Sequence, residues 1–182
     1  MPKNERFSDT AAFKIASIVI LSAIVTVFTI IVRIPIAPTR GYVNLGEVAI
    51  FFTAFIFGPT SAFFAGGLGT ALADLIGGYG QWAPISFVIH GFQGFLVGIV
   101  YNIFTKQNFR DNIFLQALFC FFAGAAIMVS GYFFAGVIMY GPAVALVEIP
   151  GNIIQNLAGI AGGIALAAAV KKAYPPVIYF RW

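Results

Sequence analysis

The chain contains apolar runs of roughly 20 residues, the length that an α-helix needs to cross the hydrocarbon core of a membrane. The first run extends from about Ala11 to Val32 and stops at Arg33 and Pro35. Uninterrupted apolar runs also argue against a transmembrane barrel, whose strands would alternate polar and apolar residues. The sequence therefore predicts helices that span a membrane.

The composition is that of a membrane protein and not of a soluble domain. Of 182 residues, 60% are apolar and 9% are charged, whereas a soluble domain carries about 25% charged residues. We predict one all-α domain over residues 1–182 with six transmembrane helices, at about 11–32, 46–57, 60–76, 85–104, 113–140 and 144–170. The second segment ends at Gly58-Pro59 after only about 12 residues, so it must be short, tilted or shielded by protein.

Basic residues indicate the orientation of these helices. Two arginines, Arg33 and Arg40, fall on one side, and the other basic residues fall on the opposite side: Lys3, Arg6, Lys14, Lys106, Arg110, Lys171, Lys172 and Arg181. Cytoplasmic loops carry the excess of Lys and Arg, so both termini are predicted to be cytoplasmic. No small-residue cleavage site follows the first run, which favours a retained helix over a signal peptide. The loops at about 33–45, 77–84 and 141–142 then face outward.

Polar residues collect near the outward side. The stretch from Gly67 to Gly91 places an acid, an amide, an indole and the single histidine at the junction of two apolar segments. Ionisable groups are costly in hydrocarbon, so a functional role is the default hypothesis for them. Four such residues fall in the outer half of the membrane: Glu47, Asp74, His90 and Glu148.

Helical spacing arranges these residues into two polar stripes. Glu148, Asn152 and Asn156 recur every four residues, and Ser86, His90 and Gln93 share one face of another helix. With the loop residues Tyr79, Gln81 and Trp82, the stripes predict a pocket for a small ligand that is partly aromatic and polar at its edges. The predicted binding residues are Arg40 in a closing loop, Glu47, Asp74, Gln81, Trp82, His90, Glu148 and Asn152.

Each of these residues also has a structural interpretation. The carboxylates at 47, 74 and 148 could cap or anchor helices at the headgroup level. Tyr79, Trp82 and Tyr140 could belong to an interfacial aromatic belt. His90 could be a satisfied interior histidine, and Arg33 is expected to extend its side chain to the outer surface.

Small residues predict close helix packing. They recur every four residues on three segments, at Ala65, Gly69, Ala73 and Gly77, at Gly94 and Gly98, and at Gly159 and Gly163. A further pair, Ala12 and Ala16, could serve internal packing or dock another membrane protein. The single cysteine, Cys120, lies in an apolar run and is expected to pack.

Several function classes lack their motifs. The chain has no G-x-x-x-x-G-K-[ST] loop, so ATP would have to be bound by a partner. Neither a cysteine pair nor a histidine cluster suggests a metal site, and we expect no cofactor and no nucleic-acid partner. Ser130 and His90 could be imagined in an intramembrane hydrolase, but no motif supports an enzyme.

Two long motifs resemble a known family. They are RIPIAPTRGYVNLGE at Arg33 to Glu47 and FGPTSAFFAGGLGTALADLIGGYGQWAPISFVIHG at Phe57 to Gly91. They resemble the substrate-binding S components of energy-coupling factor (ECF) vitamin transporters. The resemblance implies a bacterial plasma-membrane subunit that captures a vitamin from outside, beneath a lid at Pro35 to Leu45.

The same resemblance implies partners and a substrate class. The partners are a transmembrane coupling protein (the T component), which would face Ala12 and Ala16, and two cytoplasmic ATPase subunits. The S component is thought to topple in the membrane and carry its occupied pocket inward. The chain looks most like the subgroup assigned to hydroxymethylpyrimidine, the thiamine precursor, and pyridoxine would fit nearly as well. The rival hypothesis is a stand-alone facilitator or proton-coupled carrier that uses Asp74 or Glu148 as proton acceptor.

Overall fold

The protein is a helical bundle, as the sequence predicts. The structure, a computed structural model, describes residues 10–106 and 112–182. Its helices are α1 Ala11–Ile31, α2 Gly46–Ile56, α3 Pro59–Gly77, α4 Ala83–Lys106, α5 Ile113–Tyr140, α6 Pro142–Ala145 and α7 Ile149–Ala173, with 3-10 segments η2 Leu146–Glu148 and η3 Pro175–Phe180.

Four helical segments of the described residues are long and apolar enough to cross a membrane: Ala11–Ile31, Ala83–Thr105, Ile113–Tyr140 and Pro142–Ala173. Large apolar side chains are exposed on their outer faces; Ile138, for example, is 85% exposed. Such a surface suits contact with lipid. The count of six spans and the orientation stay predictions, and Lys3, Arg6 and Arg110, on which the orientation partly rests, lie outside the described residues.

Glycine and proline set the helix boundaries. Gly58, Gly78 and Gly141 have φ angles of 95°, 81° and 87°, a conformation that glycine adopts without steric cost. Pro59 and Pro142 each open the next helix, where the missing N–H would have no partner in any case. The breaks predicted at Gly58-Pro59 and Gly141-Pro142 are therefore present.

The last long segment differs from the predicted continuous helix over 144–170. It consists of α6, the 3-10 segment η2 and then α7, so Glu148 lies in η2 and only Asn152 and Asn156 lie on α7. Pro150 explains the interruption, because proline has no N–H to donate and its ring clashes with the carbonyl four residues earlier.

The predicted outward loop at 33–45 contains a β-hairpin, which the sequence analysis does not anticipate. Strand β1 (Arg33–Ile36) pairs antiparallel with β2 (Gly41–Asn44), and Arg33 lies opposite Asn44. The Arg40 N–H donates to the Ala37 carbonyl at 3.4 Å, which closes the turn. Arg40 has a φ of 51°, an uncommon value for a residue with a side chain.

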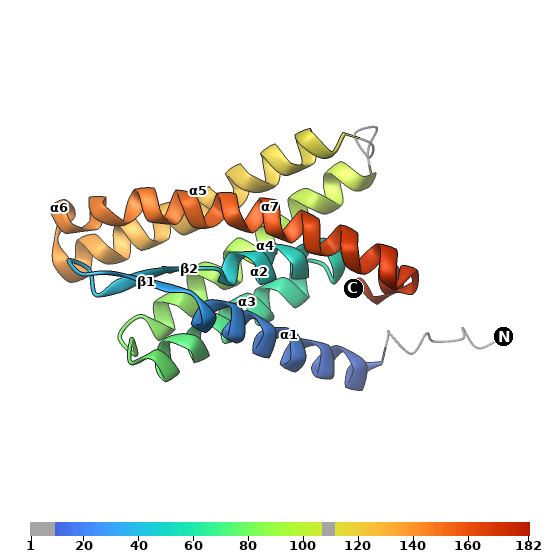
Figure 1. The fold of residues 1–182 in the computed structure, drawn as a ribbon, viewed down its shortest axis with the longest axis horizontal. Coiled ribbons are helices and arrows are strands. Elements are labelled where there is room, and N and C mark those ends of the chain that lie inside the picture. The colour runs from blue at the N-terminus through green and yellow to red at the C-terminus, as the bar shows by residue number, and fades with distance from the viewer. Residues whose placement is uncertain (1–9, 107–111) are drawn as a thin grey trace.

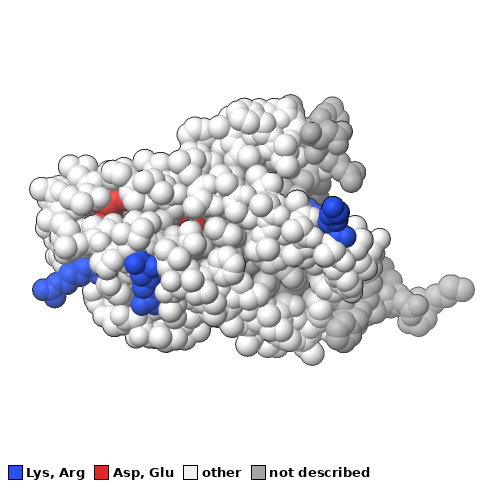
Figure 2. All heavy atoms as spheres, in the orientation of Figure 1, with Lys and Arg blue, Asp and Glu red and all other residues white. Residues whose placement is uncertain are grey.

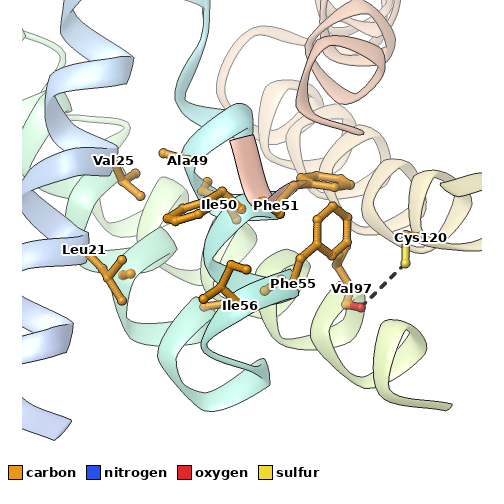
Figure 3. Close-up of a cluster of buried hydrophobic side chains, with 14 of the residues drawn as sticks. Leu21, Val25, Ala49, Ile50, Phe51, Phe55, Ile56, Val97 and Cys120 are labelled. Atoms are coloured by element: carbon orange, nitrogen blue, oxygen red, sulfur yellow. Dashed lines mark hydrogen bonds between the residues drawn. The ribbon is translucent and has the colours of Figure 1, made fainter. Parts of the chain in front are cut away.

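The short helix α2 lies at the centre of the bundle. All of its residues except Val48 are buried, so surrounding protein shields this segment from the membrane. Figure 3 shows Leu21 and Val25 of α1 on one side of α2 and Cys120 of α5 on the other. Cys120 is fully buried and its Sγ lies 3.9 Å from the Val97 carbonyl, which agrees with a packing role.

The small-residue ridges hold the helices close together. A methyl group at Gly69 would lie 2.6 Å from Val25 of α1, and one at Gly159 would lie 2.7 Å from Glu47 of α2. Such contacts leave no room for a side chain. Ala12 and Ala16 are different, because both are exposed and therefore do not pack inside this chain.

The two ends of the bundle differ in content. The hairpin and α6 lie at one end, and α1 begins and α7 ends at the other (Figure 1). On the face shown in Figure 2, Lys and Arg lie toward these two ends, with a largely uncharged surface between them.

Candidate functional site

A cavity lies beneath the hairpin, with about 440 Å³ of space between atoms when its opening is included. All the helices and strands except α2, α6 and η3 contribute residues to its wall. The wall comprises Thr29, Ile36, Gly41, Tyr42, Asn44, Thr70, Asp74, Trp82, Ser86, His90, Met128, Tyr132, Glu148, Asn152 and Gln155. Side chains from distant parts of the sequence thus converge on one enclosed volume.

Most of the predicted binding residues meet at this cavity. Asp74, Trp82, His90, Glu148 and Asn152 line it, and Glu47 lies directly behind His90, with 3.0 Å between Glu47 Oε1 and His90 Nδ1. The three carboxylate residues are 5% exposed or less, which does not fit helix anchoring at the headgroup level.

Two predicted residues lie elsewhere. Arg40 is exposed at the turn of the hairpin, and Gln81 is exposed in the connection between α3 and α4. Neither side chain is part of the cavity wall. The structure therefore separates these two residues from the other six.

Gln93, on α4, joins the buried polar groups into one network. Its Nε2 donates to Glu47 Oε2 at 2.7 Å and to Asn156 Oδ1 at 2.9 Å. Its Oε1 lies 2.8 Å from His90 Nδ1. Since Gln93 is fully buried, each of these bonds replaces a hydrogen bond to water, and losing one would leave a costly unpaired group.

His90 connects this network to the cavity. Its Nδ1 faces two acceptor oxygens, on Glu47 and Gln93, so we place a proton on Nδ1. Its Nε2 lies 3.0 Å from the Tyr132 hydroxyl, which lies 2.7 Å from Ser86 Oγ. The histidine is thus a satisfied interior residue and a part of the cavity wall at once.

Tyr42 fastens the hairpin to α3. Its hydroxyl donates to Asp74 Oδ1 at 2.7 Å, and its ring packs on Tyr79 with 4.6 Å between centroids. Arg33 lies over the Tyr42 ring at 5.0 Å and donates from Nη2 to the Ala73 carbonyl at 2.9 Å. Arg33 and Tyr79 therefore brace the hairpin.

Burial, together with the nearby Asp74 carboxylate, raises the pKa of the Tyr42 hydroxyl well above its usual range. The hydroxyl therefore stays protonated and remains a hydrogen-bond donor. This keeps the contact between hairpin and α3 intact at physiological pH.

The other edge of the hairpin rests on the last long segment. The backbone N–H of Asn44 donates to Gln155 Oε1 of α7. A methyl group at Gly41 would lie 2.6 Å from Glu148 Oε1, so the start of β2 sits directly against this carboxylate. The hairpin is therefore held on both sides of the cavity.

Trp82 forms an aromatic wall. It is 3% exposed, and the centroid of its ring lies 5.7 Å from that of Tyr132 and 6.1 Å from that of Tyr140. The buried indole of Trp82 is therefore part of the cavity wall, whereas Tyr140 is partly exposed and its place in an interfacial belt stays a prediction.

Three cavity-lining side chains carry buried polar atoms without a hydrogen-bond partner. They are the acceptor Asp74 Oδ2 and the donors Trp82 Nε1 and Asn152 Nδ2. A buried polar group without a partner costs free energy. A ligand that supplies one donor and two acceptors would satisfy all three.

Some residues of the cavity wall are absent from the set predicted from the sequence. Tyr132 gives no polar periodicity within the apolar α5, and Tyr42 lies on a strand that was not predicted. Gln155 had a usable signal, since Asn152, Gln155 and Asn156 follow the three- and four-residue spacing of one helix face. Ser130 is exposed and donates to the Ala126 carbonyl of its own helix, which gives the hydrolase hypothesis no support.

Comparison with known proteins identifies similar sequences. The model of the family described as "ECF-type riboflavin transporter, S component" matches residues 10–172. An uncharacterized protein of Pyrococcus woesei is 39% identical over 154 residues, which cover 85% of this chain and 99% of the relative. The thiamine precursor transporter HmpT of Lactococcus lactis subsp. cremoris is 29% identical over 160 residues, covering 87% of this chain and 88% of HmpT.

The family match covers all the elements that build the cavity, from α1 to α7. This is a family of transporter subunits and not of enzymes. The chain belongs to the S components of ECF-type riboflavin transporters.

Proposed function

We propose that this protein is the high-affinity vitamin-binding subunit of an ECF-type ABC importer and that its solute is hydroxymethylpyrimidine or a similar small heteroaromatic such as pyridoxine. The family membership supports a vitamin transporter subunit. The similarity to a protein named as a thiamine precursor transporter supports the substrate class.

The unpartnered atoms Asp74 Oδ2, Trp82 Nε1 and Asn152 Nδ2 carry the proposal. An aminopyrimidine offers an exocyclic amine that donates and ring nitrogens that accept. The amine pairs with Asp74, and the ring nitrogens accept from the Asn152 amide and the Trp82 indole. The hydroxymethyl group faces the remaining polar wall, which includes Glu148.

The size of the cavity favours a single ring over a flavin. The space of about 440 Å³ between atoms includes the opening to solvent, so the free room inside the closed wall is much smaller. A three-ring flavin would require the hairpin to move away from α3 and α7.

The partners follow from the family. A transmembrane coupling protein docks on the exposed face at Ala12 and Ala16, and two cytoplasmic ATPase subunits bind the ATP. The protein lies in the bacterial plasma membrane with both termini in the cytoplasm. The hairpin then faces outward and acts as the lid.

Mass spectrometry of the small molecule that co-purifies with the detergent-solubilised protein tests the proposal first. Calorimetric titration of the ligand-free protein with hydroxymethylpyrimidine, pyridoxine and riboflavin follows. We expect saturable submicromolar binding of one of the two single-ring compounds. Binding of riboflavin alone, or of none of them to folded protein, would contradict the substrate assignment.

Two matched variants locate the site. Asn152→Leu removes an unpartnered donor and is expected to abolish measurable binding. Gln81→Leu makes the same chemical change on an exposed loop and should leave affinity unchanged. Equal losses in both variants would mean that the loop at Gln81 enters the site.

Transport assays distinguish the proposed subunit from a stand-alone carrier. Vesicles that contain this chain alone should bind solute without accumulating it. Accumulation driven by a proton gradient, and lost in Asp74→Asn or Glu148→Gln, would instead identify a proton-coupled carrier.

A further inference from the structure

A second hollow lies at the opposite end of the bundle, where α2, α4 and α7 end and α5 begins. It has two adjoining compartments that share Phe55, Tyr101, Gln116 and Lys171. The polar compartment, of about 740 Å³ with its opening, also contains Thr105 and Arg181. The apolar compartment, of about 480 Å³, continues along α5 and α7 past Ile113, Ala117, Ile164 and Ala168. The hollow is therefore amphipathic.

Arg181 is fixed at the polar compartment. Its Nε donates to Asn102 Oδ1 at 2.7 Å, and its Nη1 donates to the Phe55 carbonyl at 2.6 Å. The latter belongs to the last turn of α2, whose carbonyls lack helical partners. Its Nη2 is buried and has no hydrogen-bond partner. A guanidinium held in this way presents a spare donor with little remaining freedom.

Lys171 provides a second positive charge beside it. Its Nζ donates to the Tyr101 hydroxyl at 3.2 Å. The Arg181 guanidinium lies 5.1 Å from the centre of the Tyr101 ring, and the Lys171 ammonium lies 5.7 Å from it. Among the described residues, neither cation pairs with a carboxylate, since Glu47, Asp74 and Glu148 all belong to the other end of the bundle. Two neighbouring cations that have no carboxylate partner in the described part of the chain favour an anionic ligand.

We propose that this hollow binds an anionic phospholipid, with the phosphate between Lys171 and Arg181 and an acyl chain in the apolar compartment. Basic pockets between transmembrane helices on the cytoplasmic side are suited to anionic headgroups. Arg181 contributes hydrogen-bond donors to the phosphate, and Lys171 contributes a point charge. Free phosphate shares the headgroup chemistry, but it leaves the apolar compartment without an occupant.

Native mass spectrometry of the full chain in detergent tests this site. The protein is titrated with dioleoyl phosphatidylglycerol, with dioleoyl phosphatidylcholine and with glycerol phosphate. We expect phosphatidylglycerol to bind well above the other two. Lys171→Gln should lower its affinity about fivefold, the effect of one basic residue at a membrane surface.

Lys172→Gln is the matched control, since Lys172 is the exposed neighbour of Lys171 and carries the same charge. It should keep the affinity of the unmodified protein. Arg181→Gln should lower binding further, but it also removes the contact with α2, so its thermal unfolding must be recorded as well. If Arg181→Gln fails to fold, the phosphatidylglycerol affinity of Lys171→Gln alone decides the test.

Four outcomes would overturn the proposal. Equal binding of both phospholipids would show that charge is not recognised. Equal losses in Lys171→Gln and Lys172→Gln would reduce the effect to general surface attraction. Equal affinity for glycerol phosphate and phosphatidylglycerol would leave an anion site without a lipid. Unchanged lipid binding in Lys171→Gln, together with weaker assembly with the partner subunits, would assign the charge to a protein interface instead.

Discussion

The Tyr42 hydroxyl and the Asp74 carboxylate make one short hydrogen bond between the hairpin and α3. The same carboxylate keeps its second oxygen unpartnered at the cavity. Asp74 can therefore hold the lid with one oxygen and accept from a solute with the other. At the residue scale, the proposed function thus makes lid closure and solute binding depend on the same carboxylate.

Tyr42→Phe tests the lid contact. It removes a hydrogen bond that contributes about 1–2 kcal/mol, so the solute should dissociate about 5- to 30-fold faster. Stopped-flow measurement of ligand release checks this. Tyr79→Phe is the control, because its ring packs on Tyr42 and would be retained, and its release rate should stay unchanged. A similar acceleration in both variants would assign the effect to the aromatic pair.

The raised pKa of Tyr42 also predicts a pH dependence. With the lid open, the hydroxyl returns to its ordinary pKa of about 10. The Tyr42–Asp74 hydrogen bond therefore stabilises the closed hairpin fully below about pH 10, and this stabilisation decreases as the pH rises above that value. Solute release measured from pH 7 to 11 should accelerate at the alkaline end. The Tyr42→Phe protein should release its solute at a rate that does not depend on pH in that range. Parallel acceleration in the variant would point to another group.

Gln93→Leu tests the buried network. It leaves Glu47, Asn156 and His90 short of partners in an apolar surrounding, and each unsatisfied group costs about 1–3 kcal/mol. We expect a large loss of thermal stability in detergent. Ile160→Leu, a volume-conserving change in the apolar core, should cost less than about 1.5 kcal/mol. Equal melting temperatures for Gln93→Leu and the unmodified protein would show that water replaces the lost bonds.

At the scale of elements, the packing of α7 on α2 decides where the polar side chains stand. Gly159 and Gly163 let α7 approach the backbone of α2, and this approach brings Asn156 within reach of Gln93. Pro150 interrupts the segment before α7 and leaves Glu148 on a 3-10 turn against Gly41 of the hairpin. A glycine ridge and a proline thus position two parts of the same site.

Gly159→Ala should separate these helices. The added methyl group meets Glu47 at 2.7 Å, and overpacking of this kind costs about 1–3 kcal/mol. Thermal unfolding and solute affinity should both decrease. Gly80→Ala adds the same methyl group where its nearest neighbour would be 3.8 Å away, so it should change neither. A stable, tightly binding Gly159→Ala protein would show that α7 can shift without disturbing the site.

At the scale of the whole molecule, the two ends of the bundle have different tasks. The hairpin end encloses the solute cavity, and the opposite end carries the basic amphipathic hollow. Near that opposite end, where α1 begins, the helix exposes small residues at Ala12 and Ala16, where another helix could approach closely. The candidate solute cavity and the predicted docking face therefore lie on separate surfaces.

Replacing Ala12 and Ala16 together by leucine should separate these tasks. The double variant should bind solute with unchanged affinity and lose ATP-dependent uptake when reconstituted with the coupling protein and ATPases. Ala161 and Ala165 provide the control, because they are also exposed and four residues apart, on α7. If the double variant at Ala12 and Ala16 keeps uptake and the double variant at Ala161 and Ala165 loses it, the docking face lies on α7 instead.

The sequence by itself determined the helical class, the breaks at Gly58-Pro59 and Gly141-Pro142 and most of the polar residues that the fold gathers at the cavity. The physical reason is local. Apolar length, proline and glycine act within a few residues, and a buried carboxylate or histidine needs a compensating environment wherever it occurs.

Only the tertiary structure decided which polar groups share a wall. Tyr42 became part of the site because the hairpin folds back over α3, and Tyr132 because α5 packs on α4. Arg40 and Gln81 have suitable chemistry, but the turn and the loop leave them exposed. Such proximity depends on packing between segments far apart in the chain, which no local pattern in the sequence encodes.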